Sequence, residues 1–224
     1  MKVLHISARS ETDILGIVKK AEKFFAAGKP IGIVTTIQHL HKLDEAAGYL
    51  NKKGFAAKNY GQILGCKIPD IKENIILYIG DGMFHPKGIL IEQNKRKRSV
   101  SVIAANPFTG EIKQLAEQDI DLLLKRRKGA LLRFHSSGEI GVLVSVKHGQ
   151  KEVQAKLADI YGLEKRFKNK HFYYFACDTL DFNDLGNFPF IECWVNTMCP
   201  RIGYDDSVRT SKPIINYGDL AEIG

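Results

Sequence analysis

The sequence predicts an α/β protein built from two small parallel-sheet domains, each an α/β/α unit. Two observations support this fold class. Short continuous apolar runs such as "IGIVTT" and "NIILYIG" alternate with amphipathic stretches at helical spacing. Strands that read as continuous apolar runs, rather than as alternating ones, are typical of parallel sheets covered on both faces. A polar segment near 106–110 then divides the chain into domains at 1–106 and 107–224.

The elements follow in order. The first are a strand at 3–6, an amphipathic helix within 11–30 that Gly28 and Pro30 close, a strand at 31–36 and a helix at 38–54. A strand at 74–80, a helix from about Phe84 and a strand at 99–106 complete the first half. The second half reads as a polar helix at 117–136, a helix at 150–161, and strands at 141–146, 171–177, 190–195 and 213–217.

Composition narrows the class of protein. The chain has 224 residues, of which 44% are hydrophobic and 26% charged, as in globular proteins. No apolar run approaches the ~20 residues that cross a bilayer, so no membrane partner is expected. The first residues lack the apolar segment of a secretion signal, and we expect a cytoplasmic protein.

Charge offers a further function class. The net charge of +8 indicates an acidic partner, a nucleic acid or a ribonucleoprotein. The basic run at 94–99, "NKRKRS", lacks interleaved aromatic residues that would stack on bases. We interpret the run as a solvated turn rather than as an RNA site.

Chemistry in parallel sheets gathers in loops beyond the carboxyl ends of strands. Here these loops contain no GxGxxG, GxxxxGK[ST] or HExxH motif, which leaves dinucleotide, nucleoside triphosphate and zinc-protease functions without local support. Four cysteines are too few and too scattered for a disulfide scaffold. Because no C-x-x-C pair exists, a metal site would have to collect ligands from distant loops.

Cys199 is the first candidate ligand. It follows an apolar strand directly, Pro200 ends the strand, and Arg201 would favour a thiolate. The alternative is a buried thiol beside an arginine in a local salt bridge. Cys66 lies in a second loop, bracketed by Gly61 and Gly65, and could equally serve packing.

The other candidates are weaker. Cys177 and Cys193 lie in apolar strands and are expected to act as small hydrophobic residues. His39 and His41 are two positions apart and cannot form an i, i+4 metal pair, and His85 stands alone. Ser145, Lys147, Gly149 and Gln150 form a possible anion or carboxylate cradle at a strand-to-helix junction. Asp205 and Asp206 are interpreted as a cap for a following turn.

Taken together, the loops resemble one family. In order they are "TTIQHLHKLDEA", "GQILGC", "YIGDGMFHPKGI", "ANPFTG", "VSVKHGQ" and "VNTMCPRIGYDD". They resemble the archaeal diphthamide synthase family, the 2-(3-amino-3-carboxypropyl)histidine synthases. The resemblance extends along the whole chain but corresponds to the middle and C-terminal domains of a three-domain architecture. Residues 1–25 resemble only a remnant of the first domain.

The resemblance implies a non-classical radical S-adenosylmethionine enzyme. In the family, three cysteines, one from each domain, hold a [4Fe–4S] cluster at a central cleft, and the open iron binds S-adenosylmethionine. A 3-amino-3-carboxypropyl radical then adds to a histidine of translation elongation factor 2, the first step of diphthamide formation. By position, Cys66 and Cys199 match two of the cluster ligands. The S-adenosylmethionine contacts are expected at Gln38, Gly80, Asp81, Pro107, Ser145, Lys147, Gly149, Gln150 and Arg201.

The third cysteine has no counterpart by position. We expect another chain to supply the N-terminal domain and the missing thiolate, in a homo- or hetero-oligomer. Recruitment of Cys177 or Cys193, or a chain that binds no cluster alone, are the alternatives. A different class of function also stays open, namely a non-catalytic partner or docking subunit of the synthase complex.

Overall fold

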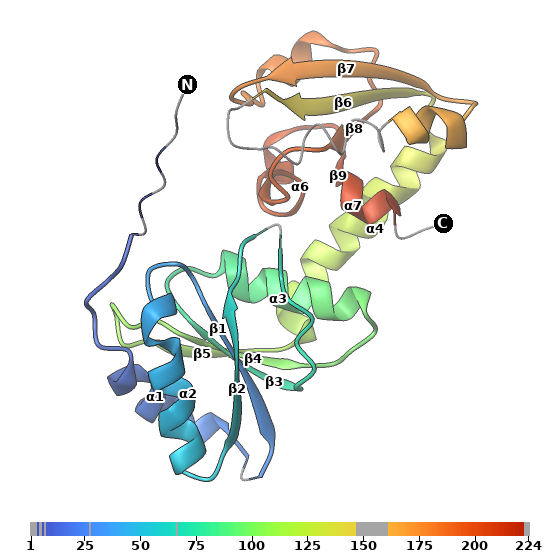
Figure 1. The fold of residues 1–224 in the computed structure, drawn as a ribbon. Helices are drawn as coiled ribbons and strands as arrows, with labels where there is room; N and C mark the ends of the chain where they lie inside the picture. The colour runs from blue at the N-terminus through green and yellow to red at the C-terminus, as the bar shows by residue number, and fades with distance from the viewer. Residues whose placement is uncertain are drawn as a thin grey trace. The chain divides into compact units, whose positions relative to one another are not determined.

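A computed structural model describes residues 4, 6, 8–26, 28–65, 67–146 and 161–221. The chain divides into two compact units, Met1–Asp121 and Leu122–Gly224 (Figure 1). Each unit has its own sheet with a hydrophobic core. The α/β class and the parallel sheets predicted from the sequence are confirmed.

The first unit contains one five-stranded sheet in its described residues, in the order β2-β1-β3-β4-β5. Its strands are β1 (Pro30–Thr35), β2 (Ala56–Gln62), β3 (Ile75–Ile79), β4 (Ser101–Ala105) and β5 (Ile112–Leu115). The first four run parallel, and β5 pairs antiparallel with β4. Helices α1 (Leu15–Ala21), α2 (Leu43–Lys52) and α3 (Phe84–Lys95) flank it, with short 3-10 turns η1 (Glu22–Phe24) and η2 (Leu40–Lys42).

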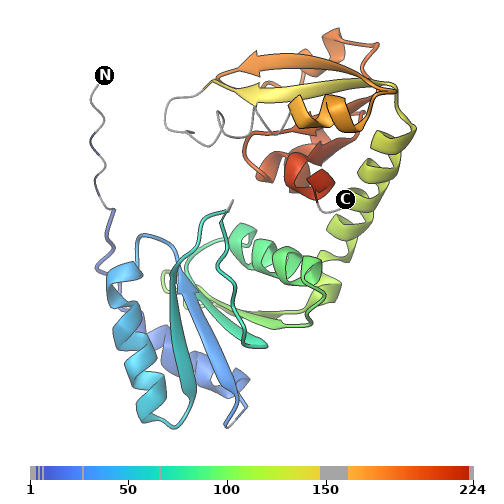
Figure 2. The same ribbon diagram turned by 45° about the vertical axis from the view of Figure 1, so that its right-hand side comes forward.

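The central strands are buried on both faces because helices cover both. Ile31, Ile33 and Leu77 pack in a core with α1 and α2. The alternate residues Ile76 and Tyr78 are also buried, and α3 lies on the face opposite α2 (Figure 2). Side chains on a strand alternate between faces, so a strand covered twice is apolar throughout.

The two edge strands of this sheet were not predicted. β2 reads "AAKNYGQ" and β5 reads "IKQL", and both leave part of their residues in solvent. An edge strand of this kind lacks the continuous apolar signature. Because β5 pairs with β4, the first unit extends to Asp121, beyond the boundary at residue 106 expected from the sequence.

The N-terminal segment also differs from expectation. Leu4 and Ile6 are each 82% exposed and belong to no strand, while Val3 and His5 lie outside the described residues. The helix expected within 11–30 is shorter, with α1 and η1 together ending at Phe24.

The second unit contains a four-stranded sheet in the part that the structure describes, all parallel, in the order β7-β6-β8-β9. The strands are β6 (Glu139–Ser145), β7 (His171–Cys177), β8 (Cys193–Asn196) and β9 (Ile214–Asn216). The turn η3 (Glu117–Ile120) leads into α4 (Asp121–Ser136). Further along the chain are η4 (Asp184–Asn187), α6 (Arg201–Tyr204), η5 (Asp206–Arg209) and α7 (Tyr217–Ala221). Residues 161–166 are helical, and the rest of the helix expected at 150–161 lies outside the described residues.

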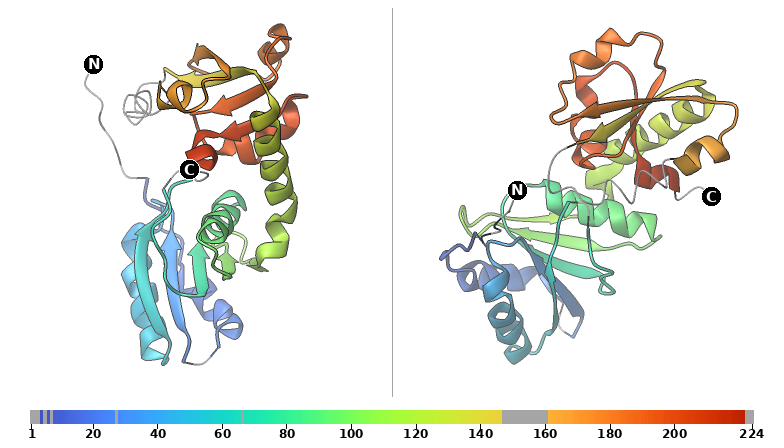
Figure 3. Two further views of the ribbon diagram at one scale, coloured as in Figure 1. Left: turned by 90° about the vertical axis from the view of Figure 1, so that its right-hand side faces the viewer. Right: turned by 45° about the horizontal axis from the view of Figure 1, so that its top comes forward.

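This sheet is also covered twice (Figure 3). Ile140 and Val142 pack with Phe134 of α4, and Leu143 packs with Trp194 on the other face. The strand expected at 190–195 begins only at Cys193, and Phe190 before it is 48% exposed. Among the described helices, none has the length and apolar character that a bilayer span needs.

Gly141 in β6 tests the packing of this core. A Cβ at position 141 would lie 2.3 Å from Cζ3 of Trp194, so an alanine there would overpack the core between β6 and Trp194. We expect Gly141→Ala to lower the free energy of unfolding by about 1–3 kcal/mol. Denaturant titration followed by fluorescence measures it, since the chain has 1 tryptophan.

Gly162 provides the matched control. It is helical, and no heavy atom lies within 4 Å of a Cβ built there. Gly162→Ala should therefore raise stability by about 0.5–1 kcal/mol. Equal midpoints for Gly141→Ala and the parent chain would contradict the packing account.

Candidate functional site

The loop after β8 presents the candidate thiol of the second unit. Cys199 lies three residues beyond Asn196, the last residue of β8, and is exposed and free. Pro200 follows as the N-cap of α6, and Ile202 N–H donates to the Cys199 carbonyl at 3.0 Å. The predicted position of this thiol, past a strand end and before a turn, is the one observed.

A pair of buried asparagines fixes that loop. Asn196 Nδ2 donates to the carbonyl of Cys199 at 2.9 Å and to Asn216 Oδ1 at 2.7 Å. Asn216 Nδ2 in turn donates to the carbonyl of Pro200 at 3.0 Å. The two side chains are only 2% and 6% exposed. Hydrogen bonds from two neighbouring strand ends thus hold the backbone that carries the thiol, because buried amides that lost these partners would be destabilising.

Close packing removes further freedom from the same loop. Thr197 donates to the Leu143 carbonyl through its hydroxyl at 2.7 Å and through its N–H at 3.1 Å. A Cβ at Gly203 would lie 2.4 Å from Asn216 Oδ1, so only glycine fits there. The backbone around Cys199 is therefore held from both sides while the residue itself faces solvent.

Arg201 makes the local contact that the sequence left open. Its Nε lies 3.4 Å from Asp205 Oδ2, one helical turn later. The Arg201 side chain remains 58% exposed, so the ion pair leaves part of the guanidinium accessible. Asp205 occupies the N-cap position of η5, which starts at Asp206, but its side chain makes no capping hydrogen bond there.

The other two cysteines behave as packing residues. Burial raises the pKa of the Cys193 thiol to about 12, and the residue is fully buried at the amino end of β8. Cys199 follows the opposite end of that strand. Cys177 is half-buried, burial raises its pKa, and its Sγ lies 3.7 Å from Met198 Sδ. Both thiols are protonated at neutral pH, which disfavours metal ligation.

In the first unit, the predicted loops also follow strand carboxyl ends. Gly80 and Asp81 follow β3, Pro107 follows β4, and Gln38 follows β1. A cavity of about 210 Å³ lies here, lined in part by Gly80, Ala104 and Asn106. Tyr78 donates its hydroxyl to the Asp81 carbonyl at 3.0 Å, and Gly80 N–H donates to the Ala105 carbonyl at 3.0 Å, so the loop after β3 is tied to its sheet.

His39 is a buried residue whose place the sequence did not reveal. It is 0% exposed, and neither ring nitrogen has a hydrogen-bond partner among the described residues. Burial lowers the pKa of the imidazole, which is therefore neutral. Its ring lies 5.4 Å from that of Phe108, between the loops that follow β1 and β4. No periodic signal marks a lone histidine as buried.

Cys66 itself lies outside the described residues, but its neighbours on both sides are described. Leu64 and Lys67 exchange two backbone hydrogen bonds, of 3.0 and 3.1 Å. A Cβ at Gly65 would lie 2.3 Å from Cε1 of Phe84, the first residue of α3. Glycine is therefore needed for this close approach to the helix.

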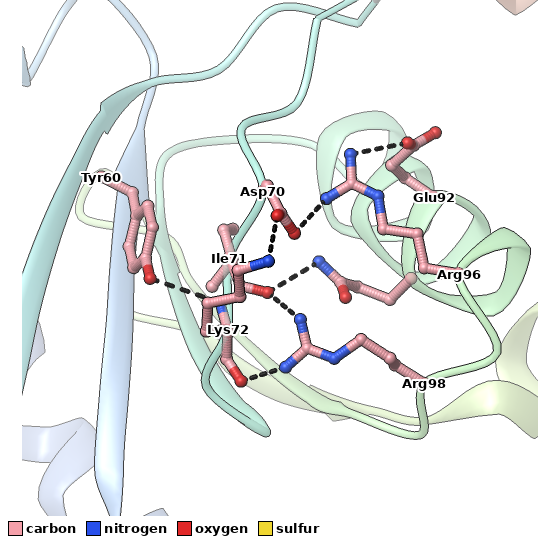
Figure 4. Close-up of polar contacts among 8 residues, drawn as sticks. Tyr60, Asp70, Ile71, Lys72, Glu92, Arg96 and Arg98 are labelled. Atoms are coloured by element: carbon pink, nitrogen blue, oxygen red, sulfur yellow. Dashed lines mark hydrogen bonds and ion pairs between the residues drawn. The ribbon is translucent and has the colours of Figure 1, made fainter.

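Residues at and just beyond the C-terminal end of α3 contact residues 70–72, which follow the loop around position 66 (Figure 4). Arg96 pairs with Asp70 at 2.7 Å and with Glu92 at 2.9 Å. The guanidinium of Arg98 donates to the carbonyls of Ile71 and Lys72. Gln93 of α3 also donates to the Ile71 carbonyl, at 3.4 Å. Helix α3 and the residues just after it thus flank both limbs of the loop that contains position 66.

These contacts correct the interpretation of the basic run at 94–99. Arg96 and Arg98 turn onto residues 70–72 instead of into solvent, and both are half-buried. The run is therefore neither a freely solvated turn nor an open RNA surface at these two positions. Lys97 between them is exposed and has a positive φ of 56°.

Several predicted residues cannot be placed. Ser145 ends β6 and is buried, but Lys147, Gly149 and Gln150 of the proposed cradle lie outside the described residues. Within the described ranges, which omit Cys66, no three His, Cys, Asp or Glu side chains gather as a metal site would require. The candidate site therefore consists, in each unit, of strand-end loops with one cysteine position apiece.

Comparisons with known proteins agree on one family. The family described as "Putative diphthamide synthesis protein" matches residues 1–222. The 2-(3-amino-3-carboxypropyl)histidine synthase of Pyrococcus horikoshii is 29% identical over 84% of this chain and 55% of its own length. That of Methanocaldococcus jannaschii is 30% identical over 94% of this chain and 57% of its own length. The chain spans about half the length of these curated relatives.

Solved structures show the same fold. The crystal structure of Dph2 from Pyrococcus horikoshii matches with a TM-score of 0.76 and 24% identity, over 94% of this chain and 62% of that chain. A second structure of that protein, with a 4Fe-4S cluster, matches equally well.

Arg98 offers a test of how the loop around position 66 is held. In Arg98→Ala the Lys72 carbonyl loses the Arg98 donor and the Ile71 carbonyl keeps only the long hydrogen bond from Gln93. We expect the first unit to lose about 1–3 kcal/mol of stability. Amide hydrogen exchange of residues 67–72 should accelerate, as mass spectrometry would measure.

The adjacent Lys97→Ala removes the same charge from an exposed side chain. It should change stability by no more than about 0.5 kcal/mol and leave exchange unaltered. If both variants exchanged at the parent rate, the arginine contacts would have no part in holding the loop.

Proposed function

Because this chain belongs to the family of diphthamide synthesis proteins, we propose that it forms part of a 2-(3-amino-3-carboxypropyl)histidine synthase. In this proposal it takes part in transferring a 3-amino-3-carboxypropyl group from S-adenosylmethionine to a histidine of translation elongation factor 2. The family match over residues 1–222 and the names of the archaeal relatives support the reaction class. A substrate from the translation machinery implies a cytoplasmic site of action.

The observation that carries the proposal is the exposed Cys199 thiol on a loop held by Asn196 and Asn216. Thiolates are the usual protein ligands of iron–sulfur clusters. A ligand loop must keep its backbone fixed while its sulfur stays accessible, and this loop does both. We assign Cys66 in the first unit and Cys199 in the second as ligands of a [4Fe–4S] cluster.

A third thiolate is required from outside these two positions. Cys193 lies at the amino end of β8 with a pKa near 12, and burial also raises the pKa of Cys177. Both are poor ligands, so we propose that a partner chain in a homo- or hetero-oligomer provides the third cysteine. When bound, the cluster supplies the electron for cleavage of S-adenosylmethionine.

The residues of this chain then bind and orient S-adenosylmethionine. Gly80 and Asn106 line the cavity at the carboxyl ends of β3 and β4. Asp81 follows Gly80 in the chain, and Pro107 follows Asn106. Gln38 follows β1, and Ser145 ends β6. The exposed part of the Arg201 guanidinium can meet a carboxylate of the ligand. Lys147, Gly149 and Gln150 complete the proposed contacts.

Anaerobic iron–sulfur reconstitution tests the cluster assignment. Cys66→Ala and Cys199→Ala should each lower bound iron and the optical absorption of the cluster several-fold. Cys177→Ala should retain both, because burial keeps that thiol protonated. Iron content and electron paramagnetic resonance are measured with the chain alone and with its partner.

Full cluster content in Cys199→Ala would refute the assignment. A partner that forms the cluster and is fully active with cysteine-free chain, while that chain still binds elongation factor 2, would favour the docking-subunit function instead.

Isothermal titration with S-adenosylmethionine tests the cradle after β6. The double variant Lys147→Ala/Gln150→Ala should bind at least roughly tenfold more weakly, since charge-assisted and helix-terminal contacts are lost. Lys151→Ala serves as a control that removes an adjacent charge. Unchanged affinity in the double variant would exclude this loop from the binding site.

A further inference from the structure

The second unit contains a cavity of about 420 Å³ between α4, α6, η5 and the start of β9. Its volume falls in the range of roughly 300–1,000 Å³ that small-molecule sites occupy. No residue that we assign to the cluster or to S-adenosylmethionine is among its described lining residues. The cavity is therefore distinct from the proposed site at the strand ends.

The polar lining of this cavity consists of hydrogen-bond donors. Arg126 and Lys212 contribute positive charge, and Ser207, Thr210 and Ser211 contribute hydroxyl groups. Among the described residues that line it, none is a carboxylate. Two cations and three hydroxyls without an opposing carboxylate favour a negatively charged ligand.

Several of these donors are not used by the protein. The side chains of Arg126, Ser207 and Ser211 have no hydrogen bond or ion pair with any described residue. On the same helix, by contrast, the neighbouring Arg127 pairs with buried Asp219 at 2.9 Å. The guanidinium of Arg126 is thus left for a ligand.

The remaining two polar residues are held in place with donor capacity to spare. Lys212 Nζ donates to the carbonyls of Phe188 and Pro189, at 3.0 and 2.8 Å. An ammonium group has three N–H donors, so one remains. Thr210 Oγ1 accepts from Lys212 N–H at 3.3 Å, which leaves its own hydrogen free to donate.

Apolar residues and two glycines, Gly129 and Gly203, form the rest of the wall. Ala130, Pro213 and Ile214 line it together with Val208, which is 58% exposed. Gly129 lies in the interior of α4, where glycine weakens a helix relative to alanine. No heavy atom lies within 4 Å of a Cβ built at Gly129, so packing does not require glycine there. The missing side chain instead keeps the cavity open.

From these features we propose that the cavity binds a small phosphate monoester. The Arg126 guanidinium matches the fork of two phosphate oxygens, and the hydroxyls and the Lys212 ammonium donate to the others. The organic part of the ligand lies against Val208 and its apolar neighbours. S-adenosylmethionine has no phosphate and should not occupy this cavity.

Titration of the full chain with inorganic phosphate and with phenyl phosphate tests the proposal. We expect phenyl phosphate to bind roughly tenfold more tightly, because its ring removes apolar surface from water. Backbone amide resonances of Gly129, Ser207 and Ser211 should shift in nuclear magnetic resonance spectra. Saturating S-adenosylmethionine should leave both affinities unchanged.

Two variants and one control separate a specific site from general attraction to a basic helix. Arg126→Gln should weaken both ligands at least roughly tenfold, and Gly129→Leu should remove binding of phenyl phosphate by filling the cavity. Lys125→Gln removes the same charge from an exposed residue of α4 that does not line the cavity. It should change affinity by less than about twofold.

Each other outcome overturns the proposal. Equal loss of phosphate affinity in Lys125→Gln and Arg126→Gln would indicate non-specific electrostatic attraction. Displacement of phenyl phosphate by S-adenosylmethionine would indicate that the cavity is part of the proposed reaction site. Absence of phosphate binding by folded protein would also exclude it. None of these results depends on whether the chain holds a cluster, so the proposed function stands or falls separately.

Discussion

The burial of the central strands on both faces is the constraint on which the rest of this structure depends. β1, β3, β6 and β8 are buried almost throughout, so their interiors admit few polar side chains. A buried polar group without a hydrogen-bond partner lowers the stability of the folded protein by about 1–3 kcal/mol. Five of the ten buried polar residues in the described chain lie at or just beyond the carboxyl end of a strand: Thr35, Ser145, Asn196, Thr197 and Asn216. Chemistry in this chain is thereby directed to the carboxyl edges of the sheets.

The two units hold their cysteine loops by different physical means. In the second unit, side-chain amides of Asn196 and Asn216 reach the carbonyls of the loop from adjacent strands. In the first unit, Phe84 at the start of α3 lies close to Gly65, and Arg96, the C-cap of α3, pairs with Asp70 and with Glu92 of the helix. The asparagine hydrogen bonds reach backbone carbonyls of the loop, and the sulfur of Cys199 has no hydrogen bond in the described structure.

The sequence predicted the strands that are buried on both faces of a sheet, and it did not predict the edge strands that are partly exposed. The apolar runs that became β1, β3, β4 and β6 could be predicted because each is covered twice. β2 and β5 could not, since edge strands with exposed polar residues have no such run. Cys199 could be placed beyond a strand because the apolar run that became β8 precedes it and Pro200 follows it as the N-cap of α6. The contacts of Arg96 and Arg98 with residues 70–72 were not predicted. Arg96 binds the Asp70 carboxylate and Arg98 binds two backbone carbonyls, all about 26 residues earlier in the chain, and no local sequence pattern indicates partners at that distance.

The net charge of the chain was also a poor guide to what it binds. The value of +8 indicated an acidic partner, a nucleic acid or a ribonucleoprotein, yet several of the cations bind groups of the protein itself. Arg98 donates to backbone carbonyls, Arg127 pairs with Asp219, and the ammonium of buried Lys170 donates to the carbonyls of His135 and Ser137. A cation held in this way contributes to the total charge but offers no donor to a ligand. Arg126 differs because it lines a cavity without a protein partner. Which anions this chain can recognise is therefore decided by where the unpaired cations lie, and not by the net charge.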